Sequence, residues 1–319
     1  MALLLPLKSA AFGRAAEAVR QGFMAAAGEA AIGIKVYATG DQPAGILSAY
    51  GDALQQGATT VVGPLTRGAV AALAASNLVN VPTLALNQPE SDEPVPPNLY
   101  LFSLSVEAEA RQVARMAFAD GRLSALVVGT DTPLSKRTQQ AFIDEWQKLH
   151  GKIVGQVDLP KSRDDYPALR DSIASLPSDM IFLAASAEQS RLARPYLGAA
   201  VATYATSQVY PGKSAQLKTI DLSGIRFVDM PWFLQPDHPA VMAYPPAEFP
   251  SAELTRLYAF GIDAFRLAQV LAANQLRAGF TLDGVTGKIS LKDGQLLERE
   301  PTPAQFVQGE AVVLESAVP

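Results

Sequence analysis

The sequence contains no cysteine and only two histidines, His150 and His238. The absence of cysteine excludes disulfides, thiol catalysis and thiolate metal sites, and it is compatible with an oxidising compartment without establishing one. Because the histidines lie far apart in the chain and no H-x-x-x-H motif occurs, a transition-metal site is also disfavoured. His150 is expected to cap the C-terminus of a helix, and His238 is expected in a surface loop. We therefore expect no metal and no cofactor.

Several other signals are missing, and each absence removes a class of function. No run of 18 apolar residues occurs, so no segment is expected to span a membrane. The net charge is -5 and no block of lysine and arginine is present, which argues against a nucleic-acid partner. The sequence has no G-x-x-x-x-G-K-[ST], G-x-G-x-x-G or G-x-S-x-G motif, and no nucleophile–base pair is visible. The protein is therefore not expected to be an enzyme.

What the chain does contain is an alternation of short apolar runs and helical patterns. Its first part predicts strands at 2–5, 32–37, 59–62, 82–86 and 99–103 and helices at 12–27, 46–55 and 69–78. The alternation then begins again, with helices at 106–119, 134–150, 166–174 and 188–197 and strands at 125–128, 153–159, 180–185 and 201–206. This order predicts an α/β protein with two doubly wound parallel sheets, and 319 residues are too many for one typical core.

The last part of the chain predicts one long helix and a short-stranded tail. The helix is expected at 251–278, with Ser251 as its N-cap and Gly279 as its stop. Edge strands are expected at 295–298 and 311–315.

Polar or glycine–proline steps follow most of the predicted strands. The carboxyl ends of parallel strands share one edge of a sheet, and open α/β sheets place their ligand crevices there. The candidate ligand-binding residues at these steps are Lys8, Ser9, Gly63, Pro64, Leu65, Asn87, Gln88, Thr130, Asp131, Ser186, Ser207 and Gln208. A tight strand-to-helix turn at 63–68 is the alternative interpretation of that step.

The stretch Thr203–Trp232 is read as strand, polar loop, strand, and it leaves two interpretations open. Its polar cluster, Thr206 to Gln208, either faces a ligand crevice or forms a solvated loop between two core strands. Trp232 and Phe233 follow Pro231, and packing near a hinge is favoured for them over an exposed anchor for a partner.

An α-amino acid ligand would need a receptor for its carboxylate and an acidic partner for its ammonium. Ser9, Thr66 and Ser186 are candidates for the first role, and Asp131 is the one carboxylate available for the second. This shortage of acidic groups disfavours an amino-acid receptor.

The sequence resembles the LppC/LpoA lipoprotein family over nearly its whole length. The segments that carry the resemblance are ALLLPL (2–7), VVGPL (61–65), LALNQ (84–88), EARQVA (109–114), YATSQVYPG (204–212), GIRFVDMPW (224–232), LYAFGIDAFRLA (257–268) and DGVTGKISL (283–291). YATSQVY together with GIRFVDMPW is highly specific, whereas VVGPL and LALNQ are weaker alone.

This resemblance implies a type I periplasmic-binding-protein fold, in which two lobes are joined by a three-strand hinge. Crossings are expected near 101–105, 230–234 and 281–285. Lobe one would then contain residues 1–103 plus 234–282, and lobe two residues 104–233 plus 283–319. The candidate loops would face a cleft between the lobes.

The resemblance also implies a function. It indicates a non-enzymatic periplasmic module that contacts a class A penicillin-binding protein and so promotes peptidoglycan synthesis. A lipidated cysteine upstream would anchor the protein in the outer membrane, and a leader is expected to have been removed before Met1. Better-known relatives carry a helical N-terminal domain before this module. The alternative is a periplasmic solute receptor that binds an amino acid or a similar small molecule.

Overall fold

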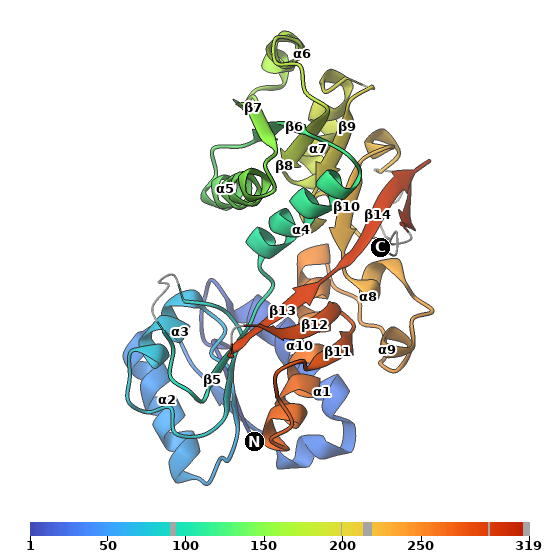
Figure 1. The fold of residues 1–319 in the computed structure, drawn as a ribbon. Helices are drawn as coiled ribbons and strands as arrows, with labels where there is room; N and C mark the ends of the chain where they lie inside the picture. Colours follow the sequence, from blue (N-terminus) through green and yellow to red (C-terminus); the bar gives the residue numbers. More distant parts are fainter. Residues whose placement is uncertain (90–93, 199, 213–218, 293, 315–319) are drawn as a thin grey trace. The chain divides into compact units, whose positions relative to one another are not determined.

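The structure is a computed structural model that describes residues 1–89, 94–198, 200–212, 219–292 and 294–314 (Figure 1). The chain divides into two compact units. Unit 1 contains Met1–Leu104 and Asp237–Arg299, and unit 2 contains Ser105–Pro236 and Glu300–Pro319. The chain therefore passes between the units three times.

Unit 1 is built on an eight-stranded sheet with the order β11-β12-β13-β5-β4-β3-β1-β2. Its strands are β1 (Ala2–Leu5), β2 (Lys35–Ala38), β3 (Val61–Val62), β4 (Thr83–Ala85), β5 (Leu99–Phe102), β11 (Thr281–Gly284), β12 (Gly287–Lys292) and β13 (Leu296–Glu300). Its helices are α1 (Gly13–Ala27), α2 (Pro43–Gln55), α3 (Arg67–Ala74), α9 (Pro239–Met242) and α10 (Ala252–Ala272), and a 3-10 helix η1 covers Gly28–Gly33. Along the sheet, the neighbouring strands β2, β1, β3, β4, β5 and β13 pair in parallel. Strand β11 pairs antiparallel with β12.

Strand β1 shows why this sheet is covered on both faces. Its four residues are all buried, and side chains alternate between the two faces of a strand. Leu3 and Leu5 belong to the apolar cluster that contains the core of α1 and α10. Ala2 and Leu4 belong to a second cluster, which includes Tyr50 of α2. A continuous apolar run thus predicts a buried parallel strand correctly.

Helices α1 and α10 lie side by side because two glycines face the opposite helix (Figure 1). A Cβ on Gly22 would lie 1.8 Å from the carbonyl oxygen of Tyr258, and a Cβ on Gly261 would lie 2.1 Å from that of Val19. The two backbones are therefore in direct contact, with no room for a methyl group at either position.

The long helix begins where the sequence predicts and ends earlier. The hydroxyl of Ser251 accepts the N–H of Leu254 at the N-terminus of α10. The helix ends at Ala272, six residues before the predicted end, because Asn274 adopts a left-handed conformation with φ 53°. Asparagine tolerates this conformation and so ends a helix as glycine does.

Asp263 of α10 is a fully buried carboxylate that holds the β11–β12 turn. Its Oδ1 accepts the N–H of Val285 at 3.1 Å, and its Oδ2 accepts the N–H and the hydroxyl of Thr286 at 2.8 and 2.7 Å. The guanidinium of Arg266 lies 3.1 Å from Oδ1. Burial raises the pKa of Asp263, while the hydrogen bonds from Thr286 and the charge of Arg266 oppose that shift.

Unit 2 is built on a seven-stranded sheet with the order β15-β14-β10-β9-β8-β6-β7. Its strands are β6 (Ser124–Gly129), β7 (Lys152–Asp158), β8 (Met180–Ala184), β9 (Ala202–Ala205), β10 (Arg226–Asp229), β14 (Thr302–Val307) and β15 (Glu310–Val313). Its α-helices are α4 (Val106–Ala119), α5 (Pro133–Lys148), α6 (Tyr166–Ala174), α7 (Ala187–Ala193) and α8 (Pro231–Leu234). Short 3-10 helices cover η2 (Arg163–Asp165), η3 (Arg194–Tyr196), η4 (Ser207–Val209) and η6 (Ile220–Leu222).

Aromatic rings fill the core of unit 2. Phe142 of α5 stacks on Phe182 of β8 with ring centroids 4.1 Å apart, and on Trp146 at 5.5 Å. Across the sheet's other end, Phe227 of β10 stacks on Phe306 of β14 at 4.4 Å. The β10–β14 pair is antiparallel, whereas β7, β6, β8, β9 and β10 are parallel.

The third passage between the units corrects our predicted boundary. Residues 283–299 were expected in lobe two, but they belong to unit 1, where β13 pairs in parallel with β5. A hinge crossing was expected near 281–285, but there the N–H groups of Val285 and Thr286 donate to Asp263, which lies far away in the sequence and also belongs to unit 1. The other two passages follow Leu104 and Pro236, against predicted boundaries after residues 103 and 233.

One strand prediction in the tail was also wrong, and one strand was missed. The strand expected at an edge, 295–298, lies inside the eight-stranded sheet, between β12 and β5. Strand β14 was not predicted, and it contains Pro303, a residue type that is disfavoured in a strand with two neighbours. The structure accepts this proline, which lies opposite Val228 in the β10–β14 pair. Strand β15 does lie at a sheet edge.

In the part of the chain that the structure describes, no helix is both long enough and apolar enough to cross a membrane.

Candidate functional site

In unit 1 the predicted site residues follow β1, β3 and β4, and several of them hold the loops themselves. Lys8 is exposed, but Ser9 is buried, and its hydroxyl accepts the N–H of Phe12 at 2.9 Å just before α1. Gly63 has a φ of 102°, and a Cβ there would lie 2.1 Å from the carbonyl oxygen of Leu4. Glycine is therefore required at this position to let the loop pass over β1.

The loops after β3 and β4 are joined by side-chain amides. Asn87 donates to the carbonyl oxygen of Leu65 at 2.9 Å, and Gln88 donates to the hydroxyl of Ser103 at 3.1 Å. The N–H of Leu86 donates to the carbonyl oxygen of Pro64 at 2.9 Å. The structure thus brings together 63–65 and 87–88 as predicted neighbours, and much of their polar capacity is used within unit 1.

In unit 2 a cavity of about 170 Å³ lies at the carboxyl ends of β6, β8 and β9. Its lining includes Thr130, Thr132, Leu134, Ser135, Ala184, Ser186, Gln189, Thr206 and Gln208. Three predicted site residues, Thr130, Ser186 and Gln208, are therefore brought together by the fold. The lining groups are hydroxyls, amides and small apolar side chains.

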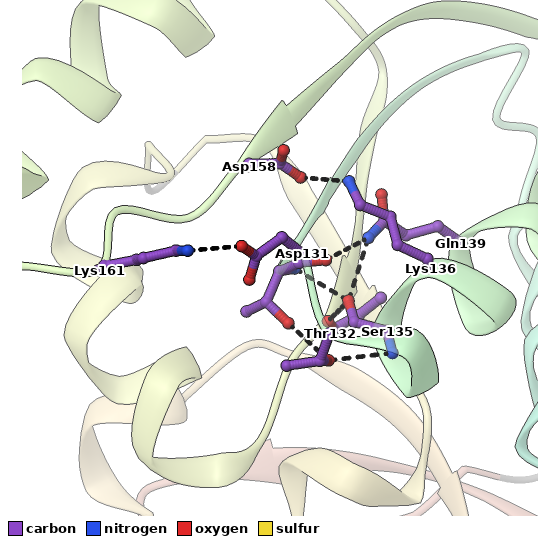
Figure 2. Close-up of polar contacts among 9 residues, drawn as sticks. Asp131, Thr132, Ser135, Lys136, Gln139, Asp158 and Lys161 are labelled. Atoms are coloured by element: carbon purple, nitrogen blue, oxygen red, sulfur yellow. Dashed lines mark hydrogen bonds and ion pairs between the residues drawn. The ribbon is translucent and has the colours of Figure 1, made fainter.

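One wall of this cavity is a hydrogen-bonded network at the start of α5 (Figure 2). The hydroxyl of Ser135 donates to the carbonyl oxygen of Ala184 at 2.7 Å and accepts the N–H of Thr130 at 2.9 Å. Thr132 caps the helix, because its hydroxyl accepts the N–H of Ser135 at 3.3 Å. The network joins the loop after β6 to the end of β8.

Gln139 completes this network from the next turn of the helix. Its amide nitrogen donates to the carbonyl oxygen of Thr130 at 3.1 Å and to Ser135 at 3.0 Å. A Cβ on Gly129 would lie 2.4 Å from that nitrogen, so glycine ends β6 here for reasons of space.

The opposite wall is the start of α7, where Ser186 and Gln189 form a capping box. The Ser186 hydroxyl accepts the N–H of Gln189 at 3.3 Å, and the Gln189 side chain accepts the N–H of Ser186 at 3.1 Å. The N-termini of α5 and α7 thus both border the cavity, where helix dipoles favour acceptor or anionic groups. The sequence pattern S-x-x-Q signals this cap, but it was not used to predict Gln189 as a site residue.

Two of the five predicted site residues in unit 2 lie outside the lining. Asp131 points toward Lys161, with 2.6 Å between carboxylate and ammonium, and its side chain is 55% exposed (Figure 2). The hydrogen bond from Lys161 lowers the pKa of Asp131. Ser207 is buried, and its N–H donates to the carboxylate of Glu109 at 3.1 Å. Glu109 of α4 therefore supports the loop that carries Gln208.

Three other expectations concern aromatic and histidine residues. Phe233 is buried, and its ring meets that of Tyr210 edge-on at 5.7 Å, which agrees with packing. Trp232 is half-buried on α8. His150 follows α5 with a left-handed φ of 62°. His238, expected in a surface loop, instead caps α9: its Nδ1 accepts the N–H of Ala240, and its Nε2 lies 3.4 Å from Asp283.

The architecture defines a class of protein. Two largely parallel sheets with flanking helices, and a chain that passes between them three times, constitute a type I periplasmic-binding-protein fold. A sequence model described as "LppC putative lipoprotein" matches residues 1–309, so the chain belongs to that family. The family predicted from the sequence motifs is therefore confirmed.

Curated relatives carry one name. The chain is 31% identical to "Penicillin-binding protein activator LpoA" of Edwardsiella piscicida over 88% of its own length and 46% of that protein. It is 32% identical to the protein of the same name from Pantoea ananatis, with 88% and 47% covered. The chain thus spans about half the length of the curated relatives it matches.

Solved structures extend this comparison. The C-domain of LpoA (YraM) from Haemophilus influenzae, described as a regulator of PBP1A, superposes with a TM-score of 0.81 at 25% identity. That match covers 98% of this chain and 99% of the domain. A putative branched-chain amino acid ABC transporter from Chromobacterium violaceum has a TM-score of 0.80 at 39% identity, with 96% and 99% covered.

Proposed function

We propose that this chain is a non-enzymatic module of a periplasmic, outer-membrane-anchored lipoprotein that activates a class A penicillin-binding protein by direct contact. The observation that carries the proposal is its match to the LpoA C-domain of H. influenzae, which this chain covers almost end to end. The names of its curated relatives support the same role.

The structure offers a physical basis for action by contact. In unit 2 the polar groups that follow β6 are largely satisfied by one another, through Thr132, Ser135 and Gln139. A carboxylate near this edge, Asp131, is paired with Lys161. This arrangement stabilises the loops after β6 and the surface that they form, and a protein partner would bind to such a surface.

The test is binding of the purified chain to a purified class A penicillin-binding protein, together with the glycan-polymerising rate of that synthase. We expect a complex and a faster rate. Gln208→Ala alters the cavity and should leave both unchanged, whereas Trp232→Ala reports whether the partner surface includes α8. Absence of binding to the native synthase would contradict the proposal.

A second candidate function is a solute receptor, favoured by the 170 Å³ cavity and by the likeness to the C. violaceum protein. The predicted site residues Thr130, Ser186 and Gln208 would then hydrogen-bond a small polar solute. A ligand present at about 100 times its dissociation constant should add roughly 2.7 kcal/mol of stability. A thermal-shift screen of amino acids and cell-wall fragments measures this, and a clear hit that Gln208→Ala removes would favour the receptor.

A further inference from the structure

A second and larger cavity, of about 480 Å³, lies elsewhere on unit 2, among α6, α7 and the short helices η2, η3 and η6. It shares no lining residue with the cavity at the strand ends. The charged and aromatic residues that line it are Arg163, Asp164, Tyr166, Glu188, Arg191, Tyr196 and Asp221. None of them was among the predicted site residues.

Two tyrosines give this cavity an aromatic wall. The rings of Tyr166 and Tyr196 lie with centroids 6.0 Å apart. The guanidinium of Arg170, on α6, lies 5.7 Å from the centroid of the Tyr196 ring and so helps to hold that ring in place. Tyr166 is 3% exposed, and burial raises the pKa of its phenol, which keeps the ring neutral. An aromatic wall of this kind accepts an apolar or cationic group of a ligand.

Charges of both signs surround this wall. Arg191 and Asp221 pair with each other at 3.2 Å, which leaves a largely neutral link between α7 and η6. Arg163, Asp164 and Glu188 line the same cavity and are exposed, and among the described residues none of the three takes part in an ion pair. The cavity therefore presents one unpaired cation and two unpaired anions to a ligand.

We propose that this cavity binds a short peptide that carries both a free ammonium and a free carboxylate. The guanidinium of Arg163 binds the carboxylate, the carboxylate of Glu188 binds the ammonium, and an apolar side chain of the peptide lies on Tyr196. Charge-assisted hydrogen bonds of this kind are stronger than neutral ones. The proposal goes beyond activation of a synthase and does not depend on it.

The size and the charge balance argue for a peptide over other ligands. A volume of about 480 Å³ is that of a site for a small organic molecule larger than one amino acid. A simple anion would be repelled by Asp164 and Glu188, and a simple cation by Arg163. Among the described residues, no group of three His, Cys, Asp or Glu side chains is placed to hold a metal ion.

The experiment uses the full chain and the dipeptide alanyl-leucine, with binding measured by isothermal titration calorimetry and by NMR. Its N-acetyl derivative lacks the ammonium, and its C-terminal amide lacks the carboxylate. We expect the unmodified dipeptide to bind and each derivative to bind about tenfold more weakly. In Arg163→Ala the amide and the unmodified dipeptide should bind equally, because the guanidinium that binds the carboxylate is gone. In Glu188→Gln the N-acetyl derivative and the unmodified dipeptide should bind equally, because the carboxylate that binds the ammonium is gone.

Controls separate this cavity from others and from general effects. Arg115→Ala removes an exposed arginine on α4 and should leave binding unchanged. Both test residues are exposed, so their substitution should not impair folding. The proposal is wrong if no binding is detected at millimolar dipeptide, or if the three ligands bind equally. It is also wrong if Gln208→Ala abolishes binding while Arg163→Ala does not, because the dipeptide would then occupy the other cavity.

Discussion

The two units differ in the closeness of their main helix contacts. In unit 1 the main helices, α1 and α10, touch backbone to backbone at Gly22 and Gly261. In unit 2 the helix α5 packs through large rings, with Phe142 between Phe182 and Trp146. The helix contact of unit 1 therefore has no room for an added methyl group. In unit 2, removing one of these rings would leave a cavity. The α1–α10 contact thus depends on the close approach of two backbones, whereas the α5 contact depends on the volume of its side chains.

The largest effect is expected from Trp146→Ala in unit 2. Trp146 is fully buried, and its indole N–H donates to the carbonyl oxygen of Lys152 at 3.2 Å. Removing such a side chain leaves a cavity and should cost about 4 kcal/mol of unfolding free energy. Urea denaturation followed by circular dichroism measures the loss. Phe118→Ala, at the exposed edge of the same cluster, is the control and should cost far less. Equal losses would contradict the volume argument.

The complementary change in unit 1 is Gly261→Ala, which adds one methyl group. Because its Cβ would lie 2.1 Å from a carbonyl oxygen, α1 and α10 must separate, at a cost of about 3 kcal/mol. Gly51→Ala is the matched control: it lies in α2, and nothing is within 4 Å of its Cβ. That control should gain up to about 1 kcal/mol from helix propensity.

Tryptophan fluorescence can assign each loss to its unit, because both tryptophans, Trp146 and Trp232, lie in unit 2. Gly261→Ala should shift the circular dichroism transition more than the fluorescence transition. If both shift equally, the two units unfold together and the contrast between them does not extend to stability.

A smaller effect is expected from Asp263→Asn in unit 1. Asparagine keeps the shape, but its NH₂ group would meet donors from Thr286, so one buried donor pair is left unsatisfied. The expected cost is about 2 kcal/mol. Hydrogen exchange at Val285 and Thr286 measures it locally, since their amides now donate to the carboxylate. Unchanged protection of both amides would show that the carboxylate does not hold the turn.

The smallest effect concerns Asp179, an exposed residue of unit 2 just before β8. Its Oδ2 accepts the N–H groups of Leu123 and Ser124, both at 3.0 Å, and the Leu123 bond lowers the pKa of Asp179. A lowered pKa means that the stabilisation is present above the unfolded pKa and is lost as the pH falls through the folded one. Asp179→Asn should therefore cost less than about 1 kcal/mol at pH 7, after allowance for solvent screening.

The pH dependence is the decisive part of this last test. The difference in unfolding free energy between Asp179→Asn and the unmodified protein should shrink from pH 5 toward pH 3. A difference that stays constant over this range would contradict the role of the charge.

The sequence predicts what depends on neighbours in the chain. The continuous apolar run Ala2–Leu5 predicts a buried strand, and Ser251 marks the start of α10 correctly. What it misses depends on residues far apart in the sequence. Nothing near Asp283 indicates that Asp263 holds the following turn in unit 1.

The candidate site was predictable to a similar extent. Strand ends predict Thr130, Ser186 and Gln208, because parallel strands share one edge. Asp131 does not line this cavity, and its carboxylate pairs with Lys161, a contact that the sequence does not show. Whether these residues face a ligand stays a prediction.

The pairing of β5 with β13, and of β10 with β14, has a consequence for how the protein is made. As the chain leaves the ribosome, β1 to β5 can assemble while β5 still has an unpaired edge, and this edge is covered only when Leu296–Glu300 has been synthesised. The edge of β10 likewise waits for Thr302–Val307. Such edges pair readily with other chains. Until its final strands are synthesised, the chain thus has two sheet edges whose native partners are absent and which can pair with other chains.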